Sequence, residues 1–315
     1  MRVVSYWSGQ LPDVSRLHFA SFLARTTGAK YELFIENCDP FASGPDDVVR
    51  ELQESGRLSI HARPWESLSE MKVAPAVSVK QLRDRGKYAD IFGPLFRRLA
   101  SSVCRRFGKS NVLGLRGSFS AIGGFDFATD SRLFSWNRWH TYRADIFRVL
   151  APSLFPGEDV LWVDLDTVFI RDFDEWPLNS SFVYRWEDQP HGNNAVIFFS
   201  EKSEHDRASL REAAVTSRSF RPWVLFTDRR CDAIGFKVLD PRLFDPAWDA
   251  DSLMAATPRT FTSSNLHSDE IVEQIERHCV VAHWHNQWRV TPEPGSPWWI
   301  LMSRMTRENR TVRGG

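Results

Sequence analysis

The sequence predicts an α/β fold, with one mostly parallel sheet flanked by helices. Two observations carry this prediction: strand-like and helix-like segments alternate over the first hundred residues, and the alternation resumes after residue 138. With 315 residues, of which 42% are hydrophobic and 25% charged, the chain has the composition of an ordinary folded protein. We expect a single domain over 1–305, followed by a flexible tail over 306–315.

The first half of the chain alternates in the way that a parallel sheet requires. The expected strands cover 2–7, 31–36 and 57–62, and the expected helices cover 15–26, 45–56, 94–107 and 138–151. In the last of these helices Tyr142, Ile146 and Val149 fall on one apolar side, and Pro152 follows its end. The segment 114–131 is rich in Gly and Ser, which predicts a long loop rather than a linker between domains.

The second half continues the pattern. Strands are expected over 159–166, 181–186, 194–200, 236–240 and 279–285, with helices over 204–215 and 268–278. No apolar run approaches the length of a membrane-spanning helix, and none follows Met1 in the manner of a signal peptide. We expect a cytoplasmic protein, either free or attached peripherally to a membrane.

Charge and cysteine content exclude several classes of protein. The 40 basic and 40 acidic residues give no net charge, so the molecule as a whole has no field that attracts polyanions. The four cysteines are scattered and form no CxxC pair, which argues against a zinc site or a disulfide framework.

The stretch "VLWVDLDTVFI" is an apolar run interrupted by two acids, Asp164 and Asp166. Burying an unpaired carboxylate is costly, so the pair needs an explanation. In a phosphatase of the haloacid dehalogenase kind, Asp164 would be the nucleophile and Asp166 the acid/base, but the further acidic pair that such enzymes need does not follow. Alternatively, the acids cap a strand end and pair with Arg171. In a third interpretation they hold a divalent cation, since Mn²⁺ and Mg²⁺ bind one or two carboxylates together with substrate phosphates.

The residues before this strand favour the cation site. Asp145 and Arg148 stand at i and i+3 of the preceding helix and project from one side of it. As a surface ion pair they would contribute little to stability. In a binding site they would supply a carboxylate for sugar hydroxyls beside a guanidinium for phosphate oxygens.

Several segments together resemble the glycosyltransferases with a DXD sugar-binding region, namely the bacterial members of family 32, and more distantly the glucosylating domains of large clostridial toxins. The family's helix "SDxxRxxxL" and strand end "YLDxD" match "ADIFRVLAP" and "LWVDLD" here. Its opening "FWxGxLP" matches "SYWSGQLP", its "NNA" strand matches "NNAVIFF", and its closing His and Trp match "AHWHNQWR". Where the family often has Gly-Gly before the strand, this chain has only Gly157.

The resemblance implies a GT-A type, Rossmann-like fold and a nucleotide-sugar-dependent hexosyltransferase. The metal, Mn²⁺ or Mg²⁺, would be held by Asp164, Asp166 and His283, with His285 as an alternative to His283. Asp145, Arg148 and Asp166 would be the catalytic residues. The residues implied to contact the donor are Trp7, Ser8, Asp145, Arg148, Asp164, Leu165, Asn194 and Trp288, with Asn193 as a weaker candidate.

The donor is expected to be a UDP-sugar bound mainly by residues 1–200, and the acceptor to meet residues 200–305. The family implies retention at the anomeric carbon, and a front-face mechanism would need no nucleophilic acid. A surface glycan or a lipid-linked precursor is the favoured acceptor, while a protein or a nucleobase remains open. A carbohydrate-binding protein without catalysis would explain the 13 tryptophans but not the ordered acids, Arg148 and His283.

Overall fold

The computed structural model describes most of the chain outside one long central gap. The described residues are 1–9, 11–36, 47–62, 139–186, 189–202, 204–217, 220–248, 258–285 and 290–314. The helix expected over 94–107 and the loop expected over 114–131 lie outside these ranges.

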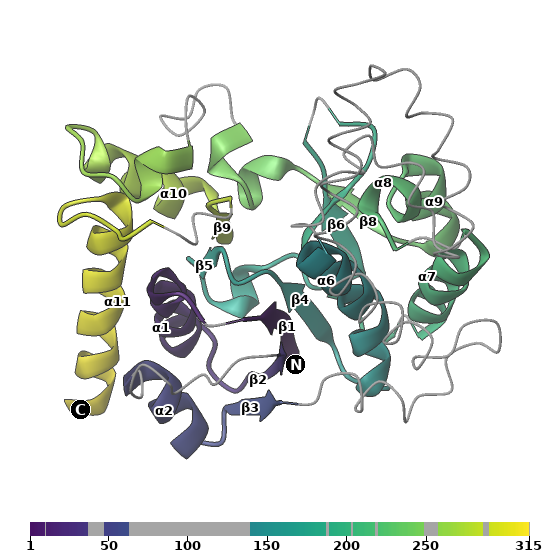
Figure 1. Cartoon of the computed structure of the whole chain (residues 1–315), viewed down its shortest axis with the longest axis horizontal. Helices are drawn as coiled ribbons and strands as arrows, with labels where there is room; N and C mark the ends of the chain where they lie inside the picture. The colour runs from purple at the N-terminus through teal and green to yellow at the C-terminus, as the bar shows by residue number, and fades with distance from the viewer. Residues whose placement is uncertain are drawn as a thin grey trace, which may run out of the picture.

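A seven-stranded mixed sheet forms the centre of the described structure (Figure 1). Its strand order is β3-β2-β1-β4-β7-β6-β8. The strands are β1 Arg2–Ser8, β2 Lys30–Glu36, β3 Leu58–His61, β4 Val160–Val163, β6 Phe182–Tyr184, β7 Asn193–Phe199 and β8 Lys237–Leu239. The strand β7 runs antiparallel to both of its neighbours, and the other four pairings are parallel. This arrangement confirms the mostly parallel α/β sheet expected from the sequence.

A second, two-stranded sheet differs from the sequence expectation. Antiparallel strands β5 (Thr167–Phe169) and β9 (Val281–His283) form it, whereas the sequence predicted that 279–285 would join the main sheet. The reason is geometric, because β4 is already paired with β1 on one side and β7 on the other. The chain therefore leaves the main sheet at Asp164, and β9 pairs with the short strand that follows.

Helices cover one face of the sheet through α6 (Trp139–Leu150), α7 (Glu204–Ser217), α8 (Pro222–Leu225) and α9 (Asp228–Ile234). From α6, Ile146 and Val149 pack on this face as the sequence predicted, beside alternate residues of the strands such as Val4 and Trp162. A 3-10 turn over Ala151–Leu154 follows α6, because Pro152 cannot continue the helix.

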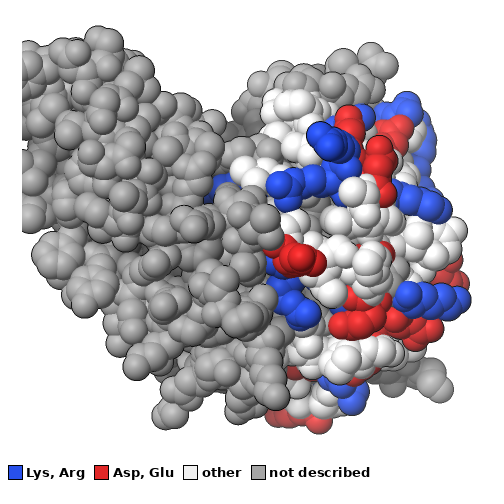
Figure 2. Space-filling model, turned by 90° about the vertical axis from the view of Figure 1, so that its right-hand side faces the viewer, with Lys and Arg blue, Asp and Glu red and all other residues white. Residues whose placement is uncertain are grey.

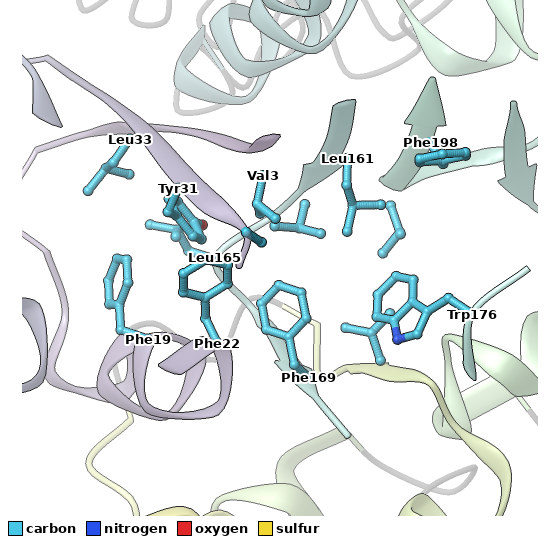
Figure 3. Packing of buried hydrophobic residues seen from close by; sticks show 14 of the residues in the cluster. Val3, Phe19, Phe22, Tyr31, Leu33, Leu161, Leu165, Phe169, Trp176 and Phe198 are labelled. Carbon is cyan, nitrogen blue, oxygen red and sulfur yellow. The ribbon is translucent and has the colours of Figure 1, made fainter. Parts of the chain in front are cut away.

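The opposite face carries α1 (Arg16–Arg25) and α2 (Asp47–Glu54). Figure 3 shows Phe19 and Phe22 of α1 pointing at Tyr31 of β2, with Leu165 and Phe169 in the same cluster. A third cluster joins α1 to α10 (Ser268–His278) and α11 (Pro297–Gly314), and α11 lies alongside α1 in Figure 1. The helix α11 continues over 306–314, where the sequence predicted a flexible tail.

Short 3-10 turns complete the connections, at Asp13–Ser15, Phe173–Glu175, Pro241–Leu243, Pro246–Trp248 and Pro258–Phe261. On the face seen in Figure 2, acidic and basic side chains of the described residues are interspersed, in agreement with the zero net charge. Of the helices in the described ranges, none combines the length and hydrophobicity that a membrane span requires.

Candidate functional site

The two acids of the opening motif lie in a three-residue turn between β4 and β5, which we call the acidic turn (Asp164 to Asp166). The backbone N–H of Asp164 donates to Ala195 O of β7 at 2.8 Å, which holds the turn beside the first residues of that strand. The carboxyl end of β1 reaches the same edge of the sheet, because β1 and β4 are parallel neighbours. The carboxyl edge of such a sheet is where ligands commonly bind.

Asp164 carries a half-buried carboxylate that two donors orient. Trp162 Nε1 donates to Asp164 Oδ1 at 2.9 Å, and Arg148 Nη2 lies 3.2 Å from the same oxygen. Burial raises the pKa of Asp164 to about 6, since the positive charge of Arg148 offsets only part of that cost and the carboxylate of Asp166 adds to it. Asp164 is therefore held as an ion mainly by its contact with Arg148.

Asp145, Arg148 and Asn194, all expected from the sequence to contact the donor, form one hydrogen-bonded network. Asn194 Nδ2 donates to Asp145 Oδ1 at 2.9 Å, and Arg148 Nη1 donates to Asn194 O at 2.9 Å. The sequence missed Arg221, whose Nη1 lies 3.2 Å from Asp145 Oδ2. Burial raises the pKa of Asp145, although both guanidiniums and the amide of Asn194 oppose the change. The carboxylate of Asp145 is thus already in contact with Asn194, Arg221 and Arg148, and it helps to fix the position of Arg148.

Asp166 and His283 are brought together by the second sheet. Thr167 of β5 is paired with His283 of β9, and Trp284 N donates to Asp166 O at 2.9 Å. Within this frame His283 Nε2 lies 3.2 Å from Asp166 Oδ2, and both side chains are almost fully buried. Burial alone lowers the pKa of His283, but the carboxylates of Asp166 and Asp245 outweigh it and raise this pKa to about 10.

Asp245 was not singled out from the sequence, where it appears only as part of the segment "RLFDP". It is fully buried and receives Trp186 Nε1 at 2.8 Å and His285 Nε2 at 2.7 Å. It also faces His283, with Nδ1 3.6 Å from Asp245 Oδ2. The backbone bond from His283 N to Phe244 O explains why these segments lie together. The bonds from the two imidazoles lower the pKa of Asp245 although burial opposes this.

His283 and His285 both face the carboxylate of Asp245, so both imidazoles are candidate metal ligands. Their ring centroids are 4.2 Å apart, and His285 has a left-handed backbone with φ of 61°. That conformation is strained for a residue with a side chain, and strain of this kind concentrates at functional sites. Possible ligand atoms of Asp245, His283 and His285 lie within 4.8 Å of one another. Carboxylate oxygens with imidazole nitrogens are a donor set that suits Mn²⁺ and its neighbours in the transition series.

The remaining predicted residues differ in their surroundings. Trp7 is partly buried against the core, and Ser8 Oγ is buried with no hydrogen-bond partner among the described residues. The side chain of Leu165 points into the core (Figure 3), which leaves only its backbone at the acidic turn. Asn193 uses its Oδ1 to accept from Ala195 N, a structural contact. Trp288, together with the neighbouring Arg289, lies outside the described residues.

Fold and site together define a mixed α/β protein with a buried polar site at the carboxyl edge of its sheet, equipped with carboxylate and imidazole groups that fit a divalent cation. No protein-family model matches the sequence, and no curated protein matches it either.

Several solved structures are similar to the chain. The glycosyltransferase GlyE of Streptococcus pneumoniae TIGR4, in its apo form, aligns over 99% of this chain and 64% of its own, with 14% identity and a TM-score of 0.45. The galactosyltransferase LgtC aligns over 99% of this chain and 96% of its own (11% identity, TM-score 0.40). Mouse xyloside xylosyltransferase 1 aligns over 92% of this chain and 98% of its own, with 10% identity and a TM-score of 0.40. The chain thus spans just under two thirds of GlyE, and likeness at this level carries no argument about its activity.

Proposed function

We propose that the chain is a metal-dependent glycosyltransferase of the GT-A type, which moves a sugar from a nucleotide-sugar donor to an acceptor hydroxyl. The observation that carries the proposal is the meeting of Asp166 and His283, with 3.2 Å between Oδ2 and Nε2. Atoms at that separation can share one cation, and the motifs that supply them lie far apart in the chain. A buried ion pair with no further role could equally be replaced by apolar side chains.

Asp166 and His283 are the proposed metal ligands, with Asp164 reaching the ion directly or through a bound water. Asp245 lies behind His283 and supports it in the manner of a carboxylate–histidine–metal triad. His285 is the alternative imidazole, and either histidine favours Mn²⁺ over Mg²⁺, which prefers an all-oxygen shell. A cation held here supplies positive charge to the diphosphate leaving group.

The donor, a UDP-sugar in this proposal, lies along the carboxyl edge of the sheet. Trp7 and Ser8 at the end of β1 are assigned to the base and ribose, and the buried hydroxyl of Ser8 is a group that a ribose could satisfy. Asn194 and the backbone of Leu165 line the sugar side. Trp288 is proposed to close over the donor.

Arg148 is the main electrostatic group that the chain itself contributes. Its Nη2 atom touches Asp164 while Nη1 is fixed by Asn194 O, so the guanidinium is oriented before substrate arrives. Asp145, which we predicted as a ligand for sugar hydroxyls, keeps that assignment through any lone pair not used by its three protein partners. Its larger effect is expected through the orientation of Arg148.

Retention of configuration, a front-face mechanism and a cytoplasmic location are parts of the same proposal. The acceptor is proposed to be a surface glycan or a lipid-linked precursor, with a protein or nucleobase as alternatives. One domain over 1–305 would carry both substrates, with the donor on 1–200 and the acceptor on 200–305.

The test is hydrolysis and transfer with a panel of nucleotide sugars in the presence of Mn²⁺, using wild type, Asp166→Ala and the control Asp174→Ala. Asp174 is an exposed acid in the turn after β5, so its loss removes the same group outside the site. We expect UDP-sugar turnover that Asp166→Ala abolishes and Asp174→Ala retains. Binding of sugars without turnover would favour a carbohydrate-binding protein, and release of phosphate from phosphomonoesters would favour the phosphatase.

A further inference from the structure

A continuous chain of buried hydrogen bonds runs beneath the acidic turn, from the last residue of β4 to the first residue of β5. Ser5 Oγ lies 2.5 Å from Val163 O and 2.5 Å from the Tyr31 hydroxyl. The Tyr31 hydroxyl lies 2.6 Å from His18 Nε2, and His18 Nδ1 lies 2.9 Å from Thr167 O. The two carbonyl groups at its ends are those that flank the acidic turn.

We call the three side chains that form this hydrogen-bond chain, those of Ser5, Tyr31 and His18, the relay. They come from β1, β2 and α1, and all are fully buried. Figure 3 shows the Tyr31 ring among the aromatic rings of Phe19 and Phe22, in a region that is otherwise apolar. Apolar side chains would fill such a space without the cost of desolvating two hydroxyls and an imidazole. The buried polar groups of the relay therefore need another explanation, and the carbonyl groups at its two ends, which flank the acidic turn, supply one.

The hydrogens of the relay can be assigned from the groups at its ends. Thr167 O can only accept, so His18 Nδ1 carries the hydrogen and donates to it. Burial lowers the pKa of His18 to about 4, so the ring is neutral at pH 7 and its Nε2 accepts from Tyr31. The single hydrogen of the Ser5 hydroxyl is then shared between Tyr31 and Val163 O. The hydrogen bond from His18 Nδ1 to Thr167 O is therefore the better defined of the two end contacts.

The side chain of Thr167 adds a hydrogen bond to the first residue of the turn. Its Oγ1 donates to Asp164 O at 2.8 Å, while its backbone O is the acceptor for His18. Asp164, which begins the turn, and Thr167, which follows Asp166, are thus linked by the same set of hydrogen bonds.

We propose that His18, Tyr31 and Ser5 are positioning residues, which hold the two ends of the acidic turn so that Asp164 faces Arg148 and Asp166 faces His283. The inference rests on the proposed function, because it gives the turn the task of holding a cation. In this proposal the three residues act through the turn and bind neither the metal nor the substrate themselves.

The first measurement concerns the turn alone and is independent of the proposed activity. Hydrogen exchange is followed in a peptide covering 161–169, in wild type, His18→Phe, Tyr31→Phe and the control Tyr6→Phe. Tyr6 lies on β1 of the same sheet, and its hydroxyl donates to Glu36 at 2.7 Å rather than to the relay. We expect exchange in this peptide to rise about tenfold in His18→Phe, less in Tyr31→Phe, and not at all in Tyr6→Phe.

The second measurement is the Kd for Mn²⁺, obtained by electron paramagnetic resonance. Groups behind a ligand typically affect metal affinity by about 10- to 100-fold, so His18→Phe should weaken binding by about tenfold and Ser5→Ala by less. His18→Asn places an amide N–H near the position of Nδ1, and it should restore most of the affinity. A role limited to filling space would not distinguish Asn from Phe in this direction.

The outcomes separate the two proposals. Unchanged exchange over 161–169 in a folded His18→Phe protein overturns the positioning role, as does equal Mn²⁺ affinity in His18→Phe and wild type. If wild type binds no Mn²⁺ while exchange still rises in the variants, the metal part of the proposed function fails and the positioning of the turn stands.

Discussion

Asp166 directly precedes β5 and His283 ends the neighbouring strand β9, with Asp166 Oδ2 3.2 Å from His283 Nε2. On its other side His283 Nδ1 lies 3.1 Å from the Tyr184 hydroxyl and 3.6 Å from Asp245 Oδ2. The imidazole is thus held between two carboxylates, which stabilise its protonated form in the absence of a cation. Any ion that binds at Nε2 must displace that proton.

This competition predicts that metal binding depends strongly on pH. The pKa of His283 is about 10, and ligation needs the neutral imidazole. At pH values below this pKa, the apparent affinity for Mn²⁺ should therefore increase about tenfold for each unit by which the pH is raised. Calorimetry at pH 7 and 8 in buffers of different ionisation enthalpy should show close to one proton released per ion. His283→Gln should remove this release, whereas His278→Ala, at an exposed histidine, should leave it intact. A heat that is the same in all buffers would contradict the assignment of His283.

Arg148→Lys tests whether the guanidinium acts through its geometry. A lysine ammonium is a single centre and cannot contact Asn194 O and Asp164 together, as Nη1 and Nη2 do. We expect kcat/KM for the donor to fall about a hundredfold, mostly through kcat. Arg229→Lys, at an exposed arginine, is the matched control. Activity within twofold of wild type in Arg148→Lys would show that charge alone suffices.

His18 should make the folded state sensitive to acid. Its pKa is about 4 when folded and near 6.5 when unfolded, so between these values the unfolded chain binds more protons. The free energy of unfolding should therefore fall with decreasing pH in this window, by about 1.4 kcal/mol per unit from this residue. Urea unfolding of wild type and His18→Phe at pH 7 and pH 5 isolates the effect. Equal losses of stability in the two proteins would show that His18 is not held neutral.

Much of the fold could be predicted because alternation and periodicity report burial directly. The helix α6 and the strands β1, β2 and β4 fall within one to three residues of their expected ends, since each has a clear apolar side. The strand β5 was missed, because three residues after a turn carry too little pattern. The partner of β9 could not be predicted either, because pairing depends on which sheet edges are free.

The site was predictable only where a motif marked it. Motifs marked Asp145, Arg148 and Asn194, and the structure brings these three residues into contact at one edge of the sheet. Asp245 and Arg221 stand in segments without a local signature, and only tertiary contacts bring them to the acids. The relay of Ser5, Tyr31 and His18 was likewise invisible, since each residue alone fits an ordinary strand or helix.

The pairing of β5 with β9 also has a consequence for biosynthesis. The strand β4 can join β1 and β2 once the first 163 residues are available, but Asp166 has no His283 until the chain has been translated past β9. A ribosome-bound intermediate would therefore have the sheet and the acidic turn before the contact between Asp166 and His283 has formed. Contacts of such long sequence separation form late. The candidate site would therefore be completed only after the main sheet that supports it.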